Sequence, residues 1–300
     1  MKTIDVIIVN YYSEELVKQC ISALKNSDAQ GFNLNVIIVS NGTKDNKLLM
    51  SFKNDYTNVI DLGYNSGFGK ACNIAAKKSN SDYLLFLNPD TLIKKDTLKL
   101  VLSMAEQNNY AVLGCKQINK LNKVQRSCSR ELTPIRYLYK ILKLNKLFPF
   151  FFKSYQMSDW DHLTDKEVNH VIGSFYFIEN KVFKKVNGFD DKFFMYYEDL
   201  DLSKRITDLG EKIFYYSKAS IFHEGGGVSN DFKVERLFYS WSSILIYSKK
   251  HFSTFNFIMM KLMIYILEPF FRLGELILKM NFSGMKQLYV SYKLLYSKTK

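Results

Sequence analysis

Asp90 is the first candidate for chemistry, because it follows an apolar run at residues 83–87 and then Asn88 and Pro89. Such a run suits a strand buried on both faces of a parallel sheet. Pro89 cannot donate to a ladder, so the strand should end before it. Asp90 would then lie at a strand's carboxyl end, where a carboxylate can hold Mg²⁺ or Mn²⁺ and, through it, a diphosphate. The alternative is a turn residue that caps the helix expected from Asp96.

Glu198 and Asp199 are the second candidates, inside an acidic and aromatic stretch at residues 189–202. Burial among aromatic rings and like-charge repulsion raise a carboxylate's pKa and can make it a general base. Helical periodicity at residues 200–209 puts both acids at the amino end of a helix. Acids are also favoured there by the helix dipole alone, so a purely structural role is the alternative.

Two other motifs are open to more than one interpretation. His223 ends a predicted strand at residues 219–223 before three glycines, and it is either a structural histidine or a metal ligand. The glycine loop at residues 63–69 allows close backbone approach to phosphate. It follows the third predicted strand and lacks the G-x-G-x-x-G spacing, which argues against a dehydrogenase.

The elements that must position these residues alternate along the chain. Strands separated by helices of ten to fifteen residues predict βαβ units and a mostly parallel sheet. The expected strands are residues 4–9, 36–39, 59–62, 84–87, 112–114, 173–178 and 219–223. The expected helices are residues 16–24, 70–78, 96–107, 181–186 and 200–209.

Length and composition limit the possible domain organisation and compartment of the protein. The chain has 300 residues, 47% of them hydrophobic, which suits one large domain or one domain with an appendage. Its four cysteines stand far apart without a CxxC pair, so we expect neither a zinc site nor disulfides, and a reducing cytoplasm. The amino terminus enters a strand directly and lacks the long apolar region of a signal peptide.

The net charge of +13 lies in two segments. Residues 116–153 carry ten Lys or Arg against one acid, and residues 249–300 carry nine against two, which leaves the remainder at −3. Such segments suit an anionic surface, either nucleic acid or phospholipid. The first is expected to be irregular and ends in the aromatic run at residues 147–152. It is interpreted as a membrane-facing loop or as a segment that buries its aromatics and solvates its lysines.

The chain beyond residue 252 is apolar but interrupted by Lys261, Glu268 and Arg272, and Pro269 should kink it. A charge at the centre of a membrane span costs about 2.5–3.5 kcal/mol. We therefore expect amphipathic helices on the protein or on a membrane interface rather than a transmembrane helix.

Together these residues resemble the family 2 glycosyltransferases, in particular the bacterial rhamnosyltransferase-like branch that builds O-antigen and capsule polysaccharide. The matching stretches lie at residues 6–11, 40–43, 65–69, 88–90 and 188–202. The last is the most specific, because it joins Gly-Phe-Asp, Phe-Phe-Met-Tyr and Glu-Asp-Leu-Asp-Leu. The resemblance covers about residues 1–230.

The resemblance implies a GT-A fold and an inverting, metal-dependent transferase that uses Mg²⁺ or Mn²⁺. Asp90 looks like the metal-binding carboxylate and His223 like a second metal ligand. Asp199 looks like the general base that deprotonates the acceptor hydroxyl, with Glu198 as its neighbour in the acceptor site.

The same resemblance implies a set of donor-binding residues at the ends of strands and in the glycine loop. These are Asn10, Ser40, Asn41, Asn65, Gly67, Asn88 and Asp90. Ser40 departs from the family, which usually has an Asp there that contacts the nucleotide, although a neutral Ser can still hydrogen-bond.

The expected organisation is a GT-A catalytic domain at residues 1–230, with residues 116–153 as a basic aromatic insertion, and a membrane-associating helical region at residues 231–300. The expected partners are a nucleotide-diphosphate sugar, with dTDP-rhamnose favoured, a polyprenyl-diphosphate-linked glycan acceptor and the anionic inner face of the cell membrane. A transferase of the same fold for galactose, glucose or an amino sugar stays open, as does a non-catalytic scaffold. A nucleic-acid-binding protein is disfavoured because no recognition motif accompanies the basic segments.

Overall fold

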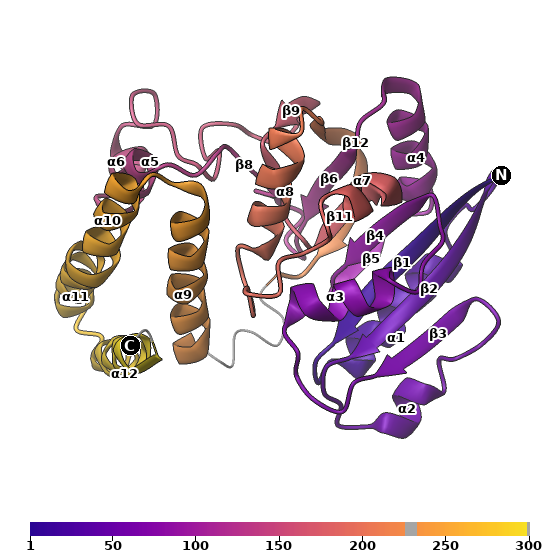
Figure 1. Ribbon diagram of the computed structural model, residues 1–300, viewed down its shortest axis with the longest axis horizontal. Coiled ribbons are helices and arrows are strands. Elements are labelled where there is room, and N and C mark those ends of the chain that lie inside the picture. The colour runs from indigo at the N-terminus through magenta and orange to yellow at the C-terminus, as the bar shows by residue number, and fades with distance from the viewer. Residues whose placement is uncertain (226–232, 299–300) are drawn as a thin grey trace.

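A central sheet organises the computed structural model, which describes residues 1–225 and 233–298 (Figure 1). The sheet has ten strands, eight of them in the order β3-β2-β1-β4-β11-β6-β12-β5, with β7 beside β6 and β9 beside β12. The strands are β1 (Lys2–Asn10), β2 (Phe32–Ser40), β3 (Thr57–Asp61), β4 (Tyr83–Leu87), β5 (Thr91–Ile93), β6 (Val112–Ile118), β7 (Val124–Gln125), β9 (Lys166–Val168), β11 (Phe175–Glu179) and β12 (Ile213–His223). A separate pair joins β8 (Cys128–Ser129) to β10 (His170–Val171).

The expected, mostly parallel sheet is confirmed. The pairs β3–β2, β2–β1, β1–β4 and β6–β12 are parallel, while β11 runs antiparallel between β4 and β6. The central strands are apolar runs, β-branched in β1 and β2 and rich in leucine and aromatic residues in β4 and β11, as suits strands buried on both faces. The carboxyl ends of β1, β2 and β4 therefore share one edge, and the antiparallel β11 begins at that edge.

Helices cover both faces of the sheet, and alternate side chains of one strand serve the two layers. In β1, Ile4, Val6 and Ile8 pack in one core with α1, α2 and α4, whereas Ile7 and Val9 pack in the other with α3, α7 and α8 (Figure 1). The helices are α1 (Glu14–Lys25), α2 (Asn46–Met50), α3 (Phe68–Ala76), α4 (Thr97–Asn108), α7 (Asn180–Lys185) and α8 (Glu198–Asp208).

A second, all-helical body lies to one side of the sheet (Figure 1). It joins two regions that are distant in the sequence, and its core includes side chains from residues 132–155 and from the C-terminal helices. Its helices are α5 (Pro134–Ile141), α6 (Leu144–Leu147), α9 (Lys233–His251), α10 (Thr254–Leu262), α11 (Glu268–Leu278) and α12 (Phe282–Lys298). The two basic segments of the sequence are thus neighbours in space.

The first basic segment is more ordered than the sequence predicts. The prediction that residues 116–153 are irregular is wrong, because they contain the end of β6, strands β7 and β8, and two helices. The segment is ordered by burial of Leu132, Tyr137 and Ile141 in the helical core. The expected domain boundary at residue 230 lies outside the described residues. Within them, none of the helices is both long and apolar enough to cross a membrane.

Pro269 begins α11 rather than interrupting a helix. A π-helical turn at Met263–Leu267 joins α10 to α11, and Pro269 occupies the first turn of α11. A proline lacks the N–H that an α-helical interior requires, and a π-turn is one way in which a helix accommodates it. The result is one long, irregular helical rod from residue 254 to residue 278.

Candidate active site

Asp90 and His223 face each other where β4 and β12 end. The His223 Nε2 atom lies 3.5 Å from the Asp90 Oδ1 atom, and the two side chains are 10% and 9% exposed. They meet because β5, which follows Asp90, pairs antiparallel with β12 and sets Thr91 opposite His223. Asp90 and His223, which the resemblance assigns to one metal site, therefore form one pair.

The orientation of the His223 ring is set by Gln117, near the end of β6. The His223 Nδ1 atom lies 2.8 Å from the Gln117 Oε1 atom, and the Gln117 amide nitrogen donates to the Ser174 hydroxyl at 2.8 Å. With the amide oxygen toward the ring, Nδ1 carries the proton and donates it to Gln117. Nε2 is left facing Asp90, which is the ring orientation that a metal-ligating histidine uses.

This donor set fits a divalent cation. A carboxylate oxygen and an imidazole nitrogen converge, and a neighbouring amide holds the ring, which is the usual environment of a ligating histidine. Among the described residues, no three or more His, Cys, Asp or Glu side chains gather as a metal cluster. A cation at Asp90 and His223 would therefore need further oxygen ligands, and a nucleotide diphosphate carries such oxygens.

Asp199 lies in the first turn of α8 and is held by backbone amides. Its Oδ2 atom accepts from the Gly173 N–H at 2.8 Å, and its Oδ1 atom accepts from the Leu200 N–H at 2.8 Å. The His170 Nε2 atom lies 3.7 Å from the Asp199 Oδ2 atom. Burial lowers the pKa of His170, although Asp199 opposes that shift, so this ring is neutral at pH 7.

A cavity of about 330 Å³ opens beside Asp199. Its lining includes Asp199 and His170 together with Arg126 and Arg236, which come from opposite halves of the chain. Both Asp199 oxygens keep lone pairs free after their backbone contacts, since a carboxylate has about four acceptor positions. The side chain can therefore accept a proton from a hydroxyl bound in this cavity.

Glu198 has a different environment from its neighbour. It is buried toward α3, where its Cβ atom lies 3.5 Å from the position that a Cβ on Gly69 would occupy. Its Oε2 atom has no hydrogen-bond partner among the described residues. Burial, with a further contribution from the Asp199 charge, raises the pKa of Glu198 to about 8. At neutral pH Glu198 is therefore a carboxylic acid.

A continuous set of hydrogen bonds joins the Asp90–His223 pair to Asp199. Gly173 donates to Asp199, the adjacent Ser174 bonds Gln117, and Gln117 holds His223. The Ser174 carbonyl also accepts from the Asn88 N–H at 3.1 Å. Gly173 and Ser174, just before β11, thus link the candidate metal-binding pair to the candidate base Asp199.

The asparagines predicted to bind the donor hold the loops of this edge together. The Asn10 amide donates to the Gly42 carbonyl at 2.9 Å, and its oxygen accepts from Ser13. The Asn41 amide donates to the Gly67 carbonyl at 3.0 Å, and its oxygen accepts from Ser66. Both are buried at the ends of β1 and β2, where their side chains fix backbone positions.

The glycine loop packs directly on the acidic and aromatic stretch. Asn65 accepts from the Gly67 N–H at 3.0 Å, and the Phe68 N–H donates to the Phe194 carbonyl at 3.1 Å. Gly67 has φ +84°, and a Cβ there would lie 2.3 Å from the Phe194 carbonyl oxygen, so only glycine fits. Ser40 is fully buried, and its hydroxyl lacks a partner among the described residues.

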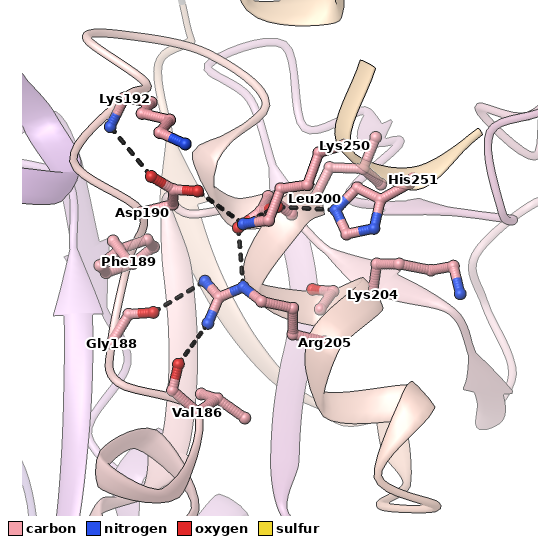
Figure 2. A network of polar contacts seen from close by, with 12 residues as sticks. Val186, Gly188, Phe189, Asp190, Lys192, Leu200, Lys204, Arg205, Lys250 and His251 are labelled. Carbon is pink, nitrogen blue, oxygen red and sulfur yellow. Dashed lines mark hydrogen bonds and ion pairs between the residues drawn. The ribbon is translucent and has the colours of Figure 1, made fainter. Parts of the chain in front are cut away.

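A buried ionic network ties the Asp199 helix to the C-terminal helices (Figure 2). Asp201 is fully buried in α8 and contacts Arg205 at 2.8 Å, Lys250 at 2.8 Å and His251 at 2.7 Å. Arg205 also donates to the carbonyls that precede the acidic stretch, at 2.5 and 2.7 Å. Burial alone would raise the pKa of Asp201, but His251, Arg205 and Lys250 lower it to about 2.

Replacing Asp201 by asparagine should lower the free energy of unfolding by about 3 kcal/mol at pH 7, because three cationic or polar partners lose a buried counter-charge. The folded-state pKa lies below the ordinary 3.8, so this stabilisation is complete above about pH 4 and is lost as the pH falls toward 2. Urea unfolding measured against pH checks both points. The control is Asp208→Asn on the same helix, whose exposed pair with Lys204 should contribute less than about 1 kcal/mol. Equal losses in the two variants would contradict the network's role.

Several residues of the site cannot be recognised as site residues from the sequence alone. Gln117 and Ser174 are ordinary strand-end residues until the fold brings them together across 57 positions. Arg126 stands in the first basic segment among other cations, and Arg236 lies outside both basic segments. The scarcity of arginine is a signal that would have marked them, since the chain has six arginines against 36 lysines.

Comparison with known proteins identifies the family of the chain. A family model described as Glycosyl transferase family 2 matches residues 5–186. The rhamnosyltransferase WbbL of Escherichia coli (strain K12) is 28% identical over 229 residues, which are 73% of this chain and 82% of that protein. The Haloferax volcanii low-salt glycan biosynthesis hexosyltransferase Agl10 is 26% identical over 206 residues, which are 67% of this chain and 61% of that protein.

Solved structures share the fold at low identity. The mannosyltransferase PcManGT from Pyrobaculum calidifontis, in complex with GDP-Man and Mn²⁺, has a TM-score of 0.55 at 11% identity and covers 98% of this chain and 75% of its own. GalNAc-T7 with UDP, GalNAc and Mn²⁺ has a TM-score of 0.57 at 13% identity, covering 74% of this chain and 43% of its own. The expected GT-A fold is thereby confirmed.

Proposed function

Since the chain belongs to glycosyl transferase family 2 and is a glycosyltransferase of glycan synthesis, we propose that it is an inverting, metal-dependent enzyme that moves rhamnose from dTDP-rhamnose to a growing cell-surface polysaccharide. The observation that carries this proposal is the hydrogen-bonded connection across Gly173 and Ser174. It joins a cation-binding pair, Asp90 and His223, to a carboxylate, Asp199, that lines a cavity. The proposed metal-dependent, inverting transfer uses these two kinds of group in one site.

In the proposed reaction the acceptor hydroxyl gives its proton to Asp199 and attacks the anomeric carbon of the donor in line. A new carbon–oxygen bond forms as the bond to the nucleotide diphosphate breaks, and its electron pair leaves with the diphosphate. Asp199 is oriented for this by the Gly173 and Leu200 amides. A divalent cation, when bound, would neutralise charge on the departing diphosphate. Asp90 and His223 are the residues that would hold it.

Glu198 has a supporting role in this proposal. Its raised pKa keeps it largely protonated at pH 7, and its side chain is buried toward α3. It therefore fills and orients the first turn of α8 beside Asp199. The buried Asn10, Ser40, Asn41 and Gly67 and the half-buried Asn65 would shape the donor loops, with few of their own polar atoms left for the nucleotide.

A direct assay can decide which nucleotide sugar is the donor. Rhamnose is favoured by the likeness to a rhamnosyltransferase, and galactosyl, glucosyl or amino-sugar transfer is the alternative. The test is hydrolysis and transfer measured over a panel of dTDP-, UDP- and GDP-sugars. We expect turnover of dTDP-rhamnose above all others, and preferential turnover of a UDP-sugar would establish the alternative.

We further propose that the acceptor is linked to a polyprenyl diphosphate and that the protein works on the anionic inner face of the cell membrane. One apolar ridge along α10, the π-turn and α11 supports this: it consists of exposed side chains at helical spacing, Phe255, Ile258, Leu262, Ile266, Phe270, Leu273 and Ile277. Phe150 and Phe151, 90% and 82% exposed, follow α6 in the same helical body. Residues 132–153 of the first basic segment and the C-terminal helices, which carry the second, belong to this body as well.

Binding to vesicles that contain phosphatidylglycerol should be measurable, and it should weaken as salt rises, because each lysine near the surface contributes up to about 1 kcal/mol. The double variant Phe255→Ser, Phe270→Ser should lower vesicle affinity about tenfold or more through lost apolar burial. Leu121→Ser, an exposed apolar change outside the helical body, is the control. Sedimentation with vesicles measures both. Equal affinity for neutral vesicles, or pelleting that resists carbonate, would contradict peripheral binding.

A further inference from the structure

Arginine is used sparingly in this chain, and most of its arginines have a structural partner. There are six arginines against 36 lysines. Arg130 pairs with Asp159, Arg205 with Asp201 and Arg272 with Glu268, while Arg136 donates to a backbone carbonyl. Arg126 and Arg236 are the other two. Neither has a hydrogen bond or ion pair with any described residue, and both line the cavity that holds Asp199.

Both arginines stand on backbone that the fold holds in place. Arg126 lies between β7 and β8, where the neighbouring Ser127 carbonyl accepts from the Ile172 N–H at 3.0 Å. Arg236 lies in the first turns of α9. That helix is anchored by the Ser243 hydroxyl, which donates to the Met195 carbonyl at 2.7 Å, and by the stacking of Tyr239 on Phe194 with ring centroids 4.7 Å apart. Two guanidinium groups are therefore presented to one cavity without an ion-pair partner among the residues that the structure describes.

The rest of the lining suits a sugar that carries negative charge. Tyr155 and Tyr196 supply aromatic surface, Gln156 is a further polar side chain, and Asp199 is the only acid among the described lining residues. A guanidinium binds phosphate and carboxylate oxygens through a planar pair of N–H groups, which a lysine ammonium cannot do. The charge of two arginines exceeds that of one aspartate, so the cavity favours an anion overall.

We infer that Arg126 and Arg236 form an acceptor subsite that binds an anionic group, a phosphate or a carboxylate, close to the hydroxyl that receives the sugar. This inference rests on the proposed function, because it assigns the cavity at Asp199 to the acceptor. The shared chemistry is an oxyanion held by two guanidinium groups. Its two sources are the diphosphate of a lipid-linked acceptor and an acidic sugar in the glycan itself.

Binding of acceptor probes without any donor tests the inference directly. The probes are farnesyl-diphosphate-linked N-acetylglucosamine against octyl N-acetylglucosaminide, and a disaccharide ending in glucuronic acid against one ending in glucose. We expect one charged probe to bind at least tenfold more tightly than its neutral counterpart. Arg126→Gln and Arg236→Gln should each lower the affinity for that charged probe about tenfold and leave the neutral one unchanged. The probe pair that responds identifies the source of the charge.

Arg136→Gln is the matched control, because it removes an arginine that is not among the lining residues and should change neither affinity. Arg126→Lys and Arg236→Lys keep the charge and should recover only part of the preference, since a lysine lacks the planar fork. Equal affinity of charged and neutral probes in the wild type would overturn the inference. So would variants that lose affinity for the nucleotide sugar while keeping the acceptor preference, because the arginines would then serve the donor diphosphate.

A failure of the proposed function can be distinguished from a failure of the arginine subsite. A wild-type protein that turns over no nucleotide sugar would refute the proposed reaction, whereas the donor-free binding comparison would still decide the role of the two arginines. Both side chains are exposed and have no hydrogen bond or ion pair within the described part of the chain, so the variants should unfold at the wild-type temperature.

Discussion

Asp199→Asn is expected to lower the turnover of sugar transfer by roughly 10²–10⁴, the usual contribution of a positioned general base. Asparagine has nearly the same shape and cannot take the acceptor's proton. Affinity for the nucleotide sugar should change little, because Asp199 lines the cavity assigned to the acceptor. Turnover and donor affinity, measured on the same preparation, check the prediction.

The surroundings of Asp199 call for two controls, thermal unfolding of the variant and the neighbouring Glu198→Gln substitution. Both Asp199 oxygens accept a backbone N–H, so the amide group of an asparagine would turn its own N–H₂ toward one donor. Thermal unfolding of the variant therefore has to accompany the kinetics. Glu198→Gln replaces a carboxyl that is already protonated at pH 7 and should leave most of the turnover. Near-wild-type turnover in Asp199→Asn with an inactive Glu198→Gln would move the base to Glu198.

Removing divalent cations is expected to abolish transfer altogether, and Mn²⁺ or Mg²⁺ added in excess over the chelator should restore it. The physical reason is that a leaving diphosphate develops negative charge, and the site offers Asp90 and His223 to hold a cation against it. Transfer by a protein stripped of metal and assayed in chelator is the measurement. Full activity under those conditions would contradict the assignment.

Variants of the pair separate metal binding from catalysis. Asp90→Asn removes one negative charge and should weaken Mn²⁺ binding in the presence of nucleotide diphosphate, as measured by electron paramagnetic resonance. Gln117→Leu leaves both ligands but frees the His223 ring from its 2.8 Å contact, and it should lower metal affinity about 10–100-fold. Unchanged Mn²⁺ binding in Asp90→Asn would show that the cation, if needed, is held elsewhere.

The position of the site follows from the sequence because strand ends are local signals. Pro89 ends a buried apolar strand, and the carboxyl ends of parallel strands share an edge, so Asp90 had to lie there. The prediction that Glu198 and Asp199 begin a helix is confirmed by α8. The different surroundings of these two acids depend on which side of α8 faces α3, and that is decided by packing.

The connections within the site were beyond reach of the sequence. Gln117, Ser174 and His223 meet because β6, β11 and β12 are neighbours in the sheet, and strand order is not encoded in any single stretch. The charge pattern likewise located two basic segments but not their packing against each other, which comes from burial of apolar side chains 100 residues apart and more. Arg126 and Arg236 likewise meet at one cavity only through the fold, because they come from distant parts of the chain.

The anomeric configuration of the product tests the central proposal most directly. Sugar transferred from dTDP-rhamnose, or from the donor that the panel identifies, is analysed by nuclear magnetic resonance of the purified product. Attack by a hydroxyl that Asp199 has deprotonated occurs once and in line, so the account predicts a linkage of configuration opposite to that of the donor. A product that retains the donor's configuration would contradict it.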